Sequence, residues 1–278
     1  MILIADSGGS KTNWVLIDTT NQKTQYFHSQ GLNPKVLTNE AIEAVLRDTL
    51  NAIQTEAISN CYFYGAGISD EFNHQKVLSL LKQFLPDAEI FVEHDLLGAA
   101  RAGLKKQQGN TLILGTGSNS AFYDGNYIVQ QVGGYGYLFG DEASGAWFGK
   151  QFLTQTCSGC YKDLALSFEQ ILGLNFVEYR NAVYLSKRPN ATLAAVFPWL
   201  LAHQNHLLIN NLFQEGIREF LRNSIIPHKT GLKTAIIGSV GFFLKQIITE
   251  ELKSFSIYDV LFIQNPLPEL VHFHQISK

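Results

Sequence analysis

Two glycine-rich turns contain the residue types that bind phosphate. The first, Asp6–Thr12 (DSGGSKT), follows the apolar segment Ile2–Ala5, and the second, Gly115–Ser120 (GTGSNS), follows Thr111–Leu114. Glycine lets main-chain N–H groups crowd around an anion, because no Cβ blocks the approach and a positive φ costs little. Both turns lead into strand-like segments, whereas the P-loop and the dinucleotide fingerprint lead straight into a helix. The sequence therefore predicts two phosphate-binding hairpins, although either turn alone could be an ordinary β-turn.

The two hairpins have the pattern of one unit built twice. A third strand is predicted after each of them, at Thr24–Ser29 and at Tyr127–Val132, and Gly117 lies 108 residues after Gly9. A repeat of that length indicates a duplicated half-molecule and not a solenoid.

One carboxylate follows a strand directly, where it could act as a general base. A short buried strand is predicted at Ala88–Val92, followed by Glu93, His94 and Asp95, and then by a helix of small residues at Leu96–Leu104. In open α/β sheets ligands bind beyond the carboxyl ends of the strands, so Asp95 could take the proton of an attacking hydroxyl. The alternative is that Asp95 caps the helix, and the sequence alone leaves both interpretations open.

The densest glycine run, Gly133–Gly149, interleaves aromatic residues with Asp141 and Glu142. The glycines allow close backbone approach, and the aromatic side chains could face a sugar ring. A helix is expected from Asp141 to about Gln155, and the helix dipole would favour acids in its first turn.

Strands and helices alternate around these motifs. The polar run Lys105–Asn110 marks the expected domain boundary, and Thr38 or Asn39 is the expected cap of the first helix. The further predicted helices are Asn39–Glu56, Glu71–Leu85, Leu164–Leu172, Ala191–His203, Leu207–Arg222 and Phe242–Leu252, and the further predicted strands are Ser59–Gly65, Lys233–Ile237 and Val260–Gln264, the last followed by a short tail.

Composition agrees with a globular protein of two domains. The chain has 278 residues, of which 46% are hydrophobic and 16% charged, and its net charge of −3 gives no sign of a nucleic-acid or anionic-membrane partner. No basic segment precedes Ile2–Ile4, so we expect no secretory signal, and no apolar run reaches the roughly 18 residues needed to span a bilayer. Three cysteines fit a reducing cytoplasm.

Four motifs in chain order resemble the N-acetylglucosamine kinase branch of the BadF/BadG/BcrA/BcrD ATPase family, which belongs to the actin, hexokinase and Hsp70 superfamily. The resemblance implies an α/β fold of duplicated actin-like ATPase (ribonuclease H-like) domains, 1–107 and 108–278, with a cleft between them and a helical insertion at about 140–223. The motifs are Asp6–Thr12, His94–Ala99, Gly115–Asn119, and Gly133–Gly136 with Gly140–Gly145.

The resemblance also implies a cytoplasmic homodimeric kinase that transfers the γ-phosphoryl group of ATP to the 6-hydroxyl of N-acetylglucosamine or a close amino sugar. Asp95 would be the base, and Asp6 would hold Mg²⁺ through water. Tyr135 stands where the family often has tryptophan. The implied ATP contacts are Gly8, Gly9, Ser10, Lys11, Thr12, Gly115, Thr116, Gly117 and Ser118 for the phosphates and Gly238, Ser239 and Gly241 for the adenosine, and the implied sugar contacts are Asn33, Asp95, Asn119, Gly134, Tyr135 and Asp141.

Cys157 and Cys160 form a C-x-x-C pair, which could bind a metal or do redox chemistry. Some members of the same broad family are ATP-dependent activators of dehydratases and share an iron–sulfur cluster across a dimer. An activator or sensor of this type is therefore the alternative to a kinase. The pair lies at the end of the helix expected after Asp141, away from both hairpins, which favours structural or incidental thiols.

Overall fold

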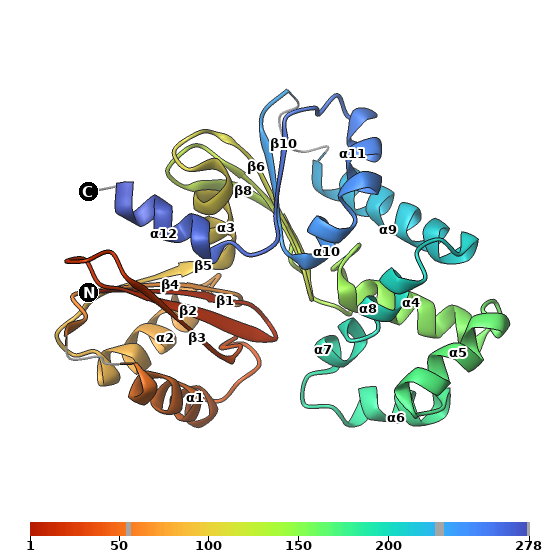
Figure 1. Cartoon of the computed structure of the whole chain (residues 1–278), viewed down its shortest axis with the longest axis horizontal. Helices are drawn as coiled ribbons and strands as arrows, with labels where there is room; N and C mark the ends of the chain where they lie inside the picture. Colours follow the sequence, from red (N-terminus) through yellow and green to blue (C-terminus); the bar gives the residue numbers. More distant parts are fainter. Residues whose placement is uncertain (54–56, 226–230, 277–278) are drawn as a thin grey trace. The chain divides into compact units, whose positions relative to one another are not determined.

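The protein consists of two compact units, each with its own five-stranded sheet (Figure 1). The computed structural model describes residues 1–53, 57–225 and 231–276. Unit 1 contains Met1–Gln107, Gly125–Tyr127 and Asn265–Lys278, and unit 2 contains Gln108–Asp124 and Ile128–Gln264.

The unit 1 sheet has the strand order β3-β2-β1-β4-β5. The central strand β1 pairs antiparallel with β2 and parallel with β4. Both faces of β1 are covered, which explains why Ile2–Ala5 is an unbroken apolar run. By contrast, β3 lies at an edge of the sheet and is largely exposed. The strands are β1 (Ile2–Ser7), β2 (Lys11–Ile17), β3 (Thr24–Gln30), β4 (Asn60–Gly65) and β5 (Glu89–His94).

Helices cover both faces of this sheet: α1 (Asn39–Ala52) and α2 (Glu71–Phe84) one face, α3 (Asp95–Leu104) and α12 (Leu267–Ile276) the other (Figure 1). The Thr38 side chain accepts a hydrogen bond from the Ala41 N–H, so Thr38 is the N-cap of α1, as predicted. We expected this helix to reach Glu56, but residues 54–56 lie outside the described residues.

The unit 2 sheet has the order β10-β9-β6-β7-β8. When the strands of each unit are numbered from its own start, this is the order of unit 1, so the predicted duplication is confirmed. The strands are β6 (Gly109–Leu114), β7 (Ser118–Tyr123), β8 (Ile128–Gly133), β9 (Thr234–Ile237) and β10 (Val260–Ile263).

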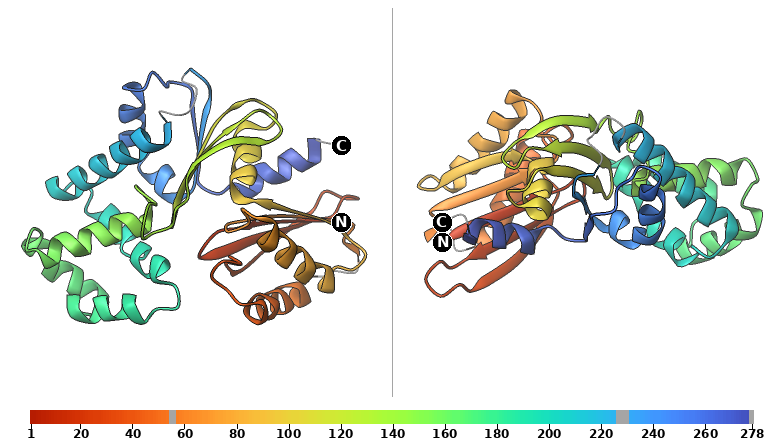
Figure 2. Two further views of the ribbon diagram at one scale, coloured as in Figure 1. Left: turned by 180° about the vertical axis from the view of Figure 1, so that it is seen from behind. Right: turned by 90° about the horizontal axis from the view of Figure 1, so that it is seen from above.

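Most helices of unit 2 lie between β8 and β9 in the sequence, and α5 and α6 lie farthest from the sheet (Figures 1 and 2). Aromatic rings, among them Phe148, Phe152 and Phe168, pack in the core of this unit together with aliphatic side chains. Among the helices that the structure describes, none is both long and apolar enough to cross a membrane. The unit 2 helices are α4 (Gly145–Cys157), α5 (Lys162–Leu172), α6 (Phe176–Leu185), α7 (Pro189–Ala194), α8 (Phe197–Ala202), α9 (Leu207–Ile225), α10 (Ser239–Phe243) and α11 (Lys245–Lys253).

The sequence interpretation was wrong about several helices. Helix α6 was not predicted, and the single helix expected at Ala191–His203 is two short helices, α7 and α8. The helix expected at Phe242–Leu252 is also split, into α10 and α11. The expected C-terminal tail is the helix α12, which packs on β1, β2 and α3 of unit 1.

Candidate active site

The β1–β2 hairpin of unit 1 carries the first predicted phosphate turn. The Gly8 N–H donates to the Lys11 carbonyl at 3.0 Å and closes the turn. The chain leaving β3 crosses close behind it, because a Cβ on Gly31 would lie 2.4 Å from the Gly8 oxygen. Only glycine fits at position 31, and the turn is thereby braced by a residue that the sequence did not single out.

The Thr12 hydroxyl makes its hydrogen bonds within unit 1. It lies 2.8 Å from the Ser7 hydroxyl and donates to the Gln30 carbonyl at 3.0 Å, and the whole residue is buried. The Leu32 N–H completes the network by donating to the Ser7 oxygen. The Thr12 side chain thus ties β2 to β3, so the phosphate contact expected of Thr12 does not come from its hydroxyl.

Asp6, the next-to-last residue of β1, lies in an acidic environment. Burial and then the charge of Asp95 raise the pKa of this carboxyl group to about 7, against the opposing effects of Lys11 and of a hydrogen bond from Asn13. Unit 1 therefore brings together two predicted site carboxylates and the lysine of the phosphate turn. A cation at this place would relieve the repulsion between the two acids.

Asp95 is the first residue of α3, but it does not cap that helix. The cap is His94, whose Nδ1 accepts a hydrogen bond from the Leu96 N–H at 3.1 Å. The capping interpretation of Asp95 is therefore wrong. The Asp95 side chain is 19% exposed, and its Oδ1 lies 2.9 Å from the His94 Nδ1. Burial favours a neutral imidazole, but the hydrogen bond to Asp95 and the charge of Asp95 outweigh burial and raise the pKa of His94. The neutral ring can accept from the Leu96 N–H at Nδ1, whereas the protonated ring donates from Nδ1 to Asp95 instead.

Asn33, expected to contact the sugar, lies in the loop after β3. Its Oδ1 accepts a hydrogen bond from the Lys35 N–H at 3.0 Å. Gly67, just after β4, approaches this side chain so closely that a Cβ there would lie 2.1 Å from Oδ1, and Gly67 has a φ of +83°. The sequence showed glycines at the end of this strand but gave no reason to connect Gly67 with Asn33, which is 34 residues away.

The second phosphate turn, between β6 and β7, is held by the start of α4. The Gly145 and Ala146 N–H groups donate to the carbonyls of Gly115 and Thr116, at 2.8 and 3.1 Å. The Gly115 N–H donates in turn to the Gly117 carbonyl. These bonds fix the turn on the helix.

Asp141 lies before α4, not in its first turn as expected. It has a φ of +58°, the helix begins at Gly145, and Ser144 is the N-cap. Asp141 is 8% exposed, and its Oδ1 accepts a hydrogen bond from the Ser118 N–H at 3.3 Å. A Cβ on Gly117 would lie 3.0 Å from the Asp141 Oδ2. The left-handed backbone thus turns this carboxylate onto the phosphate turn of unit 2.

Asn119 and Gly134 also meet in unit 2. Asn119 pairs in register with Gly133, and a Cβ on Gly134, whose φ is +74°, would lie 2.8 Å from the Asn119 Nδ2. The next residue, Tyr135, is 70% exposed. Three of the residues expected to hold the sugar therefore lie within one short stretch around the β7–β8 pair.

Gly238 connects β9 to the five-residue helix α10. Its φ is +116°, and a Cβ there would lie 2.4 Å from the Leu114 oxygen. A Cβ on Gly241 would meet the Ile236 side chain at 2.6 Å. Both glycines are thus required by packing within unit 2, beside the end of β6.

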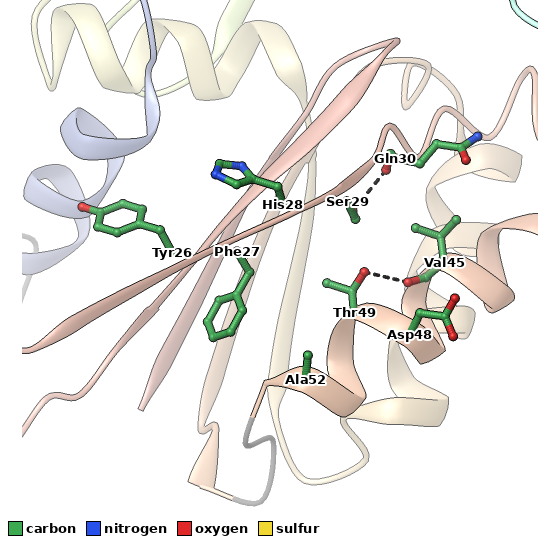
Figure 3. Close-up of a pocket in the computed structure, with 9 residues that line it drawn as sticks. All are labelled: Tyr26, Phe27, His28, Ser29, Gln30, Val45, Asp48, Thr49 and Ala52. Carbon is green, nitrogen blue, oxygen red and sulfur yellow. Dashed lines mark hydrogen bonds between the residues drawn. The ribbon is translucent and has the colours of Figure 1, made fainter.

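A hollow of about 610 Å³ lies between β3 and α1 (Figure 3). None of the predicted site residues lines it, so its position does not support a role as the active site. The lining residues are Tyr26, Phe27, His28, Ser29, Gln30, Val45, Asp48, Thr49 and Ala52.

The three cysteines differ in exposure. Cys157 and Cys160 are exposed free thiols, whereas Cys61 is buried and its pKa is raised to about 12 by burial. Within residues 1–53, 57–225 and 231–276 there is no group of three or more His, Cys, Asp or Glu side chains that could hold a metal ion.

Known proteins similar to this chain include sugar kinases. No protein-family model matches the sequence. An N-acetyl-D-glucosamine kinase of Dictyostelium discoideum is 26% identical over 163 residues, which are 53% of this chain and 51% of that protein. The match thus spans about half the length of this curated relative.

Solved structures match over the whole length. The proposed N-acetylglucosamine kinase of Porphyromonas gingivalis is 31% identical and superposes with a TM-score of 0.93 over 100% of this chain and 99% of its own. A glucokinase of Streptomyces griseus, solved with glucose and AMPPNP, is 13% identical with a TM-score of 0.58 over 99% and 98% of the chains, which shows a common fold alone. The chain therefore belongs to the N-acetylglucosamine kinase family and has the two-domain actin-like ATPase fold.

Proposed function

We propose that the protein transfers the γ-phosphoryl group of ATP to the 6-hydroxyl of N-acetylglucosamine or a closely related amino sugar. The observation that carries this proposal is the Asp95 carboxylate, which follows β5 directly and is relieved of capping by His94. Membership of the kinase family supports the same reaction. The similar proteins named as N-acetylglucosamine kinases favour this reaction over the alternative of an iron–sulfur activator.

Asp95 is the general base in this proposal. Its carboxylate accepts the proton of the sugar hydroxyl while the hydroxyl oxygen bonds to the γ-phosphorus. The bond from that phosphorus to the β–γ bridging oxygen breaks, and ADP leaves with the electron pair. A base of this kind contributes about 10²–10⁴ in rate, and alignment and charge neutralisation supply most of the remaining acceleration.

The two glycine turns are the proposed phosphate contacts. Main-chain N–H groups of Gly8–Lys11 and Gly115–Ser118 are the proposed donors to the phosphate oxygens, with the Lys11 ammonium adding charge. The Gly8, Gly115 and Ser118 N–H groups donate within the protein in this structure, so these three would have to exchange their present partners for phosphate oxygens. Thr12 would contribute through its main chain alone, because its hydroxyl is buried. Gly238, Ser239 and Gly241 are the proposed neighbours of the adenosine, by resemblance to the family. Within unit 2 they lie at the turn between β9 and α10.

Asp6 is the proposed residue for Mg²⁺. The fit rests on the chemistry of the group: a partly buried carboxylate beside a second one, with its pKa raised to about 7, gains from a nearby divalent cation. Mg²⁺ prefers oxygen ligands and keeps several waters, so it needs no cage of protein side chains. When bound, the ion would neutralise charge on the phosphates.

The sugar is proposed to bind Asn33 and Asp95 from unit 1 and Asn119, Gly134 and Asp141 from unit 2, with Tyr135 available for stacking. The support is local: Asn33 is positioned by Gly67, Asn119 by Gly134, and Asp141 by its bond to the Ser118 N–H.

A panel of sugars tests the proposed reaction. N-Acetylglucosamine is expected to stimulate ADP release at least tenfold over the rate with ATP alone. The stimulation should also exceed that by glucosamine or glucose, because one buried polar group discriminates between sugars by about tenfold. ADP is followed in a coupled assay, and the product is identified by phosphorus NMR. 6-Deoxy-N-acetylglucosamine is the control and should not be phosphorylated. Failure of every sugar to stimulate turnover would refute the kinase proposal.

Gly67→Ala is expected to raise KM for the sugar about tenfold with a smaller change in kcat. The new Cβ would lie 2.1 Å from the Asn33 Oδ1 at a φ of +83°, so Asn33 must move away, and a lost hydrogen bond is worth about this factor. Steady-state kinetics measures the effect. Gly173→Ala is the matched control, because it has a φ of +66° with open space around it. An unchanged KM in Gly67→Ala would argue against Asn33 as a sugar contact.

A further inference from the structure

Three polar side chains form a row across the unit 1 sheet, beside the first phosphate turn. Asp6 on β1 pairs in register with Asn13 on β2, and Asn13 pairs with His28 on β3. Residues directly opposite each other on neighbouring strands point to the same face of a sheet. In Figure 3, His28 and Phe27 point to opposite sides of β3.

Hydrogen bonds connect the three side chains, each donating toward Asp6. The Asn13 side chain donates to the Asp6 carboxylate, and its Oδ1 lies 3.0 Å from the His28 Nδ1. In the ionised form that would bind Mg²⁺ the Asp6 carboxylate can only accept, so Asn13 must then turn its NH₂ group toward Asp6 and its oxygen toward His28. His28 must then carry a proton on Nδ1. Each member of the row thus fixes the orientation of the next.

We propose that Asn13 and His28 are positioning residues, which hold the Asp6 carboxylate in the orientation that binds Mg²⁺ with the nucleotide. This inference rests on the proposed role of Asp6 in holding the ion. Lys11 and Asp95 act on Asp6 through charge, which has little direction, whereas the Asn13 amide supplies a directed bond. Asn13 is 6% exposed, so water does not readily replace it.

Other bonds hold the strands together without these side chains. The Trp14 Nε1 donates to the Ser29 hydroxyl at 2.9 Å, and the Thr12 hydroxyl donates to the Gln30 carbonyl. His28 is exposed on the edge strand. Removal of its ring should therefore leave the fold intact and change only the orientation of Asn13.

Calorimetric titration with ADP, in the presence and absence of Mg²⁺ and without sugar, tests the proposal. The quantity compared is the factor by which Mg²⁺ tightens ADP binding. Asn13→Ala is expected to lower this factor about tenfold, since the lost bond is to a charged group, and His28→Ala about threefold. His28→Gln should restore it, because the glutamine amide can donate to the Asn13 oxygen. Binding of ADP without Mg²⁺ should not change.

Tyr26→Ala is the control, because Tyr26 is an exposed residue of the same strand. The inference would be overturned if Mg²⁺ tightened ADP binding by the wild-type factor in a folded Asn13→Ala. It would also be overturned if Tyr26→Ala lost as much of this factor as His28→Ala. If Mg²⁺ does not affect ADP binding in the wild type, the role of Asp6 and the inference fail together. If the wild type phosphorylates no sugar but Asn13→Ala still weakens the effect of Mg²⁺, the proposed reaction fails and the positioning role is supported.

Discussion

Asp95→Asn is expected to lower kcat for sugar phosphorylation about 10²–10⁴-fold and to change KM by less than about threefold. The amide has nearly the shape of the carboxylate, so substrate binding should persist, but it cannot accept the proton of the attacking hydroxyl. Coupled measurement of ADP release at saturating N-acetylglucosamine and ATP gives kcat. A loss confined to kcat identifies an interaction made only in the transition state.

The matched control is Glu93→Gln, an identical change of acid to amide two residues earlier, at the end of β5. It should keep kcat within about threefold of the wild type, since Glu93 has no role in the proposed reaction. Circular dichroism and thermal unfolding would confirm that both variants fold. Full activity in Asp95→Asn, or an equal loss in Glu93→Gln, would remove Asp95 as the base while leaving the kinase proposal open.

The two hairpins could be predicted from the sequence because their signals are local. Ile2–Ala5 and Thr111–Leu114 are apolar runs that end in glycine turns, and both are strands as expected. Their duplication followed from the repeated strand and glycine-turn pattern and its spacing, and the identical strand order of the two sheets confirms it.

Elements fixed by distant contacts could not be predicted. The positive φ of Asp141 and Ala143 delays the start of α4, and that start is fixed by bonds from Gly145 and Ala146 to the second phosphate turn, about 30 residues earlier. The ten-residue helix α12 gains its stability by packing Leu267, Leu270 and Val271 against strands from the other end of the chain.

The same limit applies to the candidate site. Sequence reasoning found the glycines of the two turns, because glycine clusters are visible in the chain. It did not find Gly31 or Gly67, since each is required by a close approach to a loop that only the folded chain brings near. It also could not show that the Thr12 hydroxyl is turned inward.

A buried polar cluster attaches α12 to unit 1 and should make stability depend on pH. The Arg101 Nη1 donates to the Tyr64 hydroxyl at 2.9 Å, and that hydroxyl lies 2.9 Å from the His274 Nε2. His274 is 7% exposed and stacks on Tyr62 with 3.8 Å between ring centroids. With Arg101 donating to the Tyr64 oxygen, the Tyr64 proton is free to point at His274, and a neutral imidazole accepts it. Burial and then the charge of Arg101 lower the pKa of His274 to about 4.

The sign of the pH effect follows from this lowered value. Between pH 6.5 and about 4 the unfolded chain binds a proton at His274 that the folded chain does not, so the free energy of unfolding falls as pH falls through that window. The full shift corresponds to about 3 kcal/mol, and about 2 kcal/mol of it should be lost between pH 7.5 and pH 5. The raised pKa values of Asp6 and His94 act in the opposite sense, since their contributions to stability are lost as pH rises.

His274→Gln separates these effects, because glutamine can accept the Tyr64 proton but does not titrate. Urea denaturation is carried out at pH 7.5 and at pH 5. Pulsed hydrogen exchange with mass spectrometry monitors the unfolding, and it reports on peptides of unit 1 separately from those of unit 2. The wild type should lose about 2 kcal/mol more than His274→Gln between the two pH values, because only the wild type must keep a buried imidazole neutral at pH 5. His272→Gln, an exposed change on the same helix, should behave as the wild type. Parallel losses in the wild type and His274→Gln would mean that α12 is not held by a neutral His274.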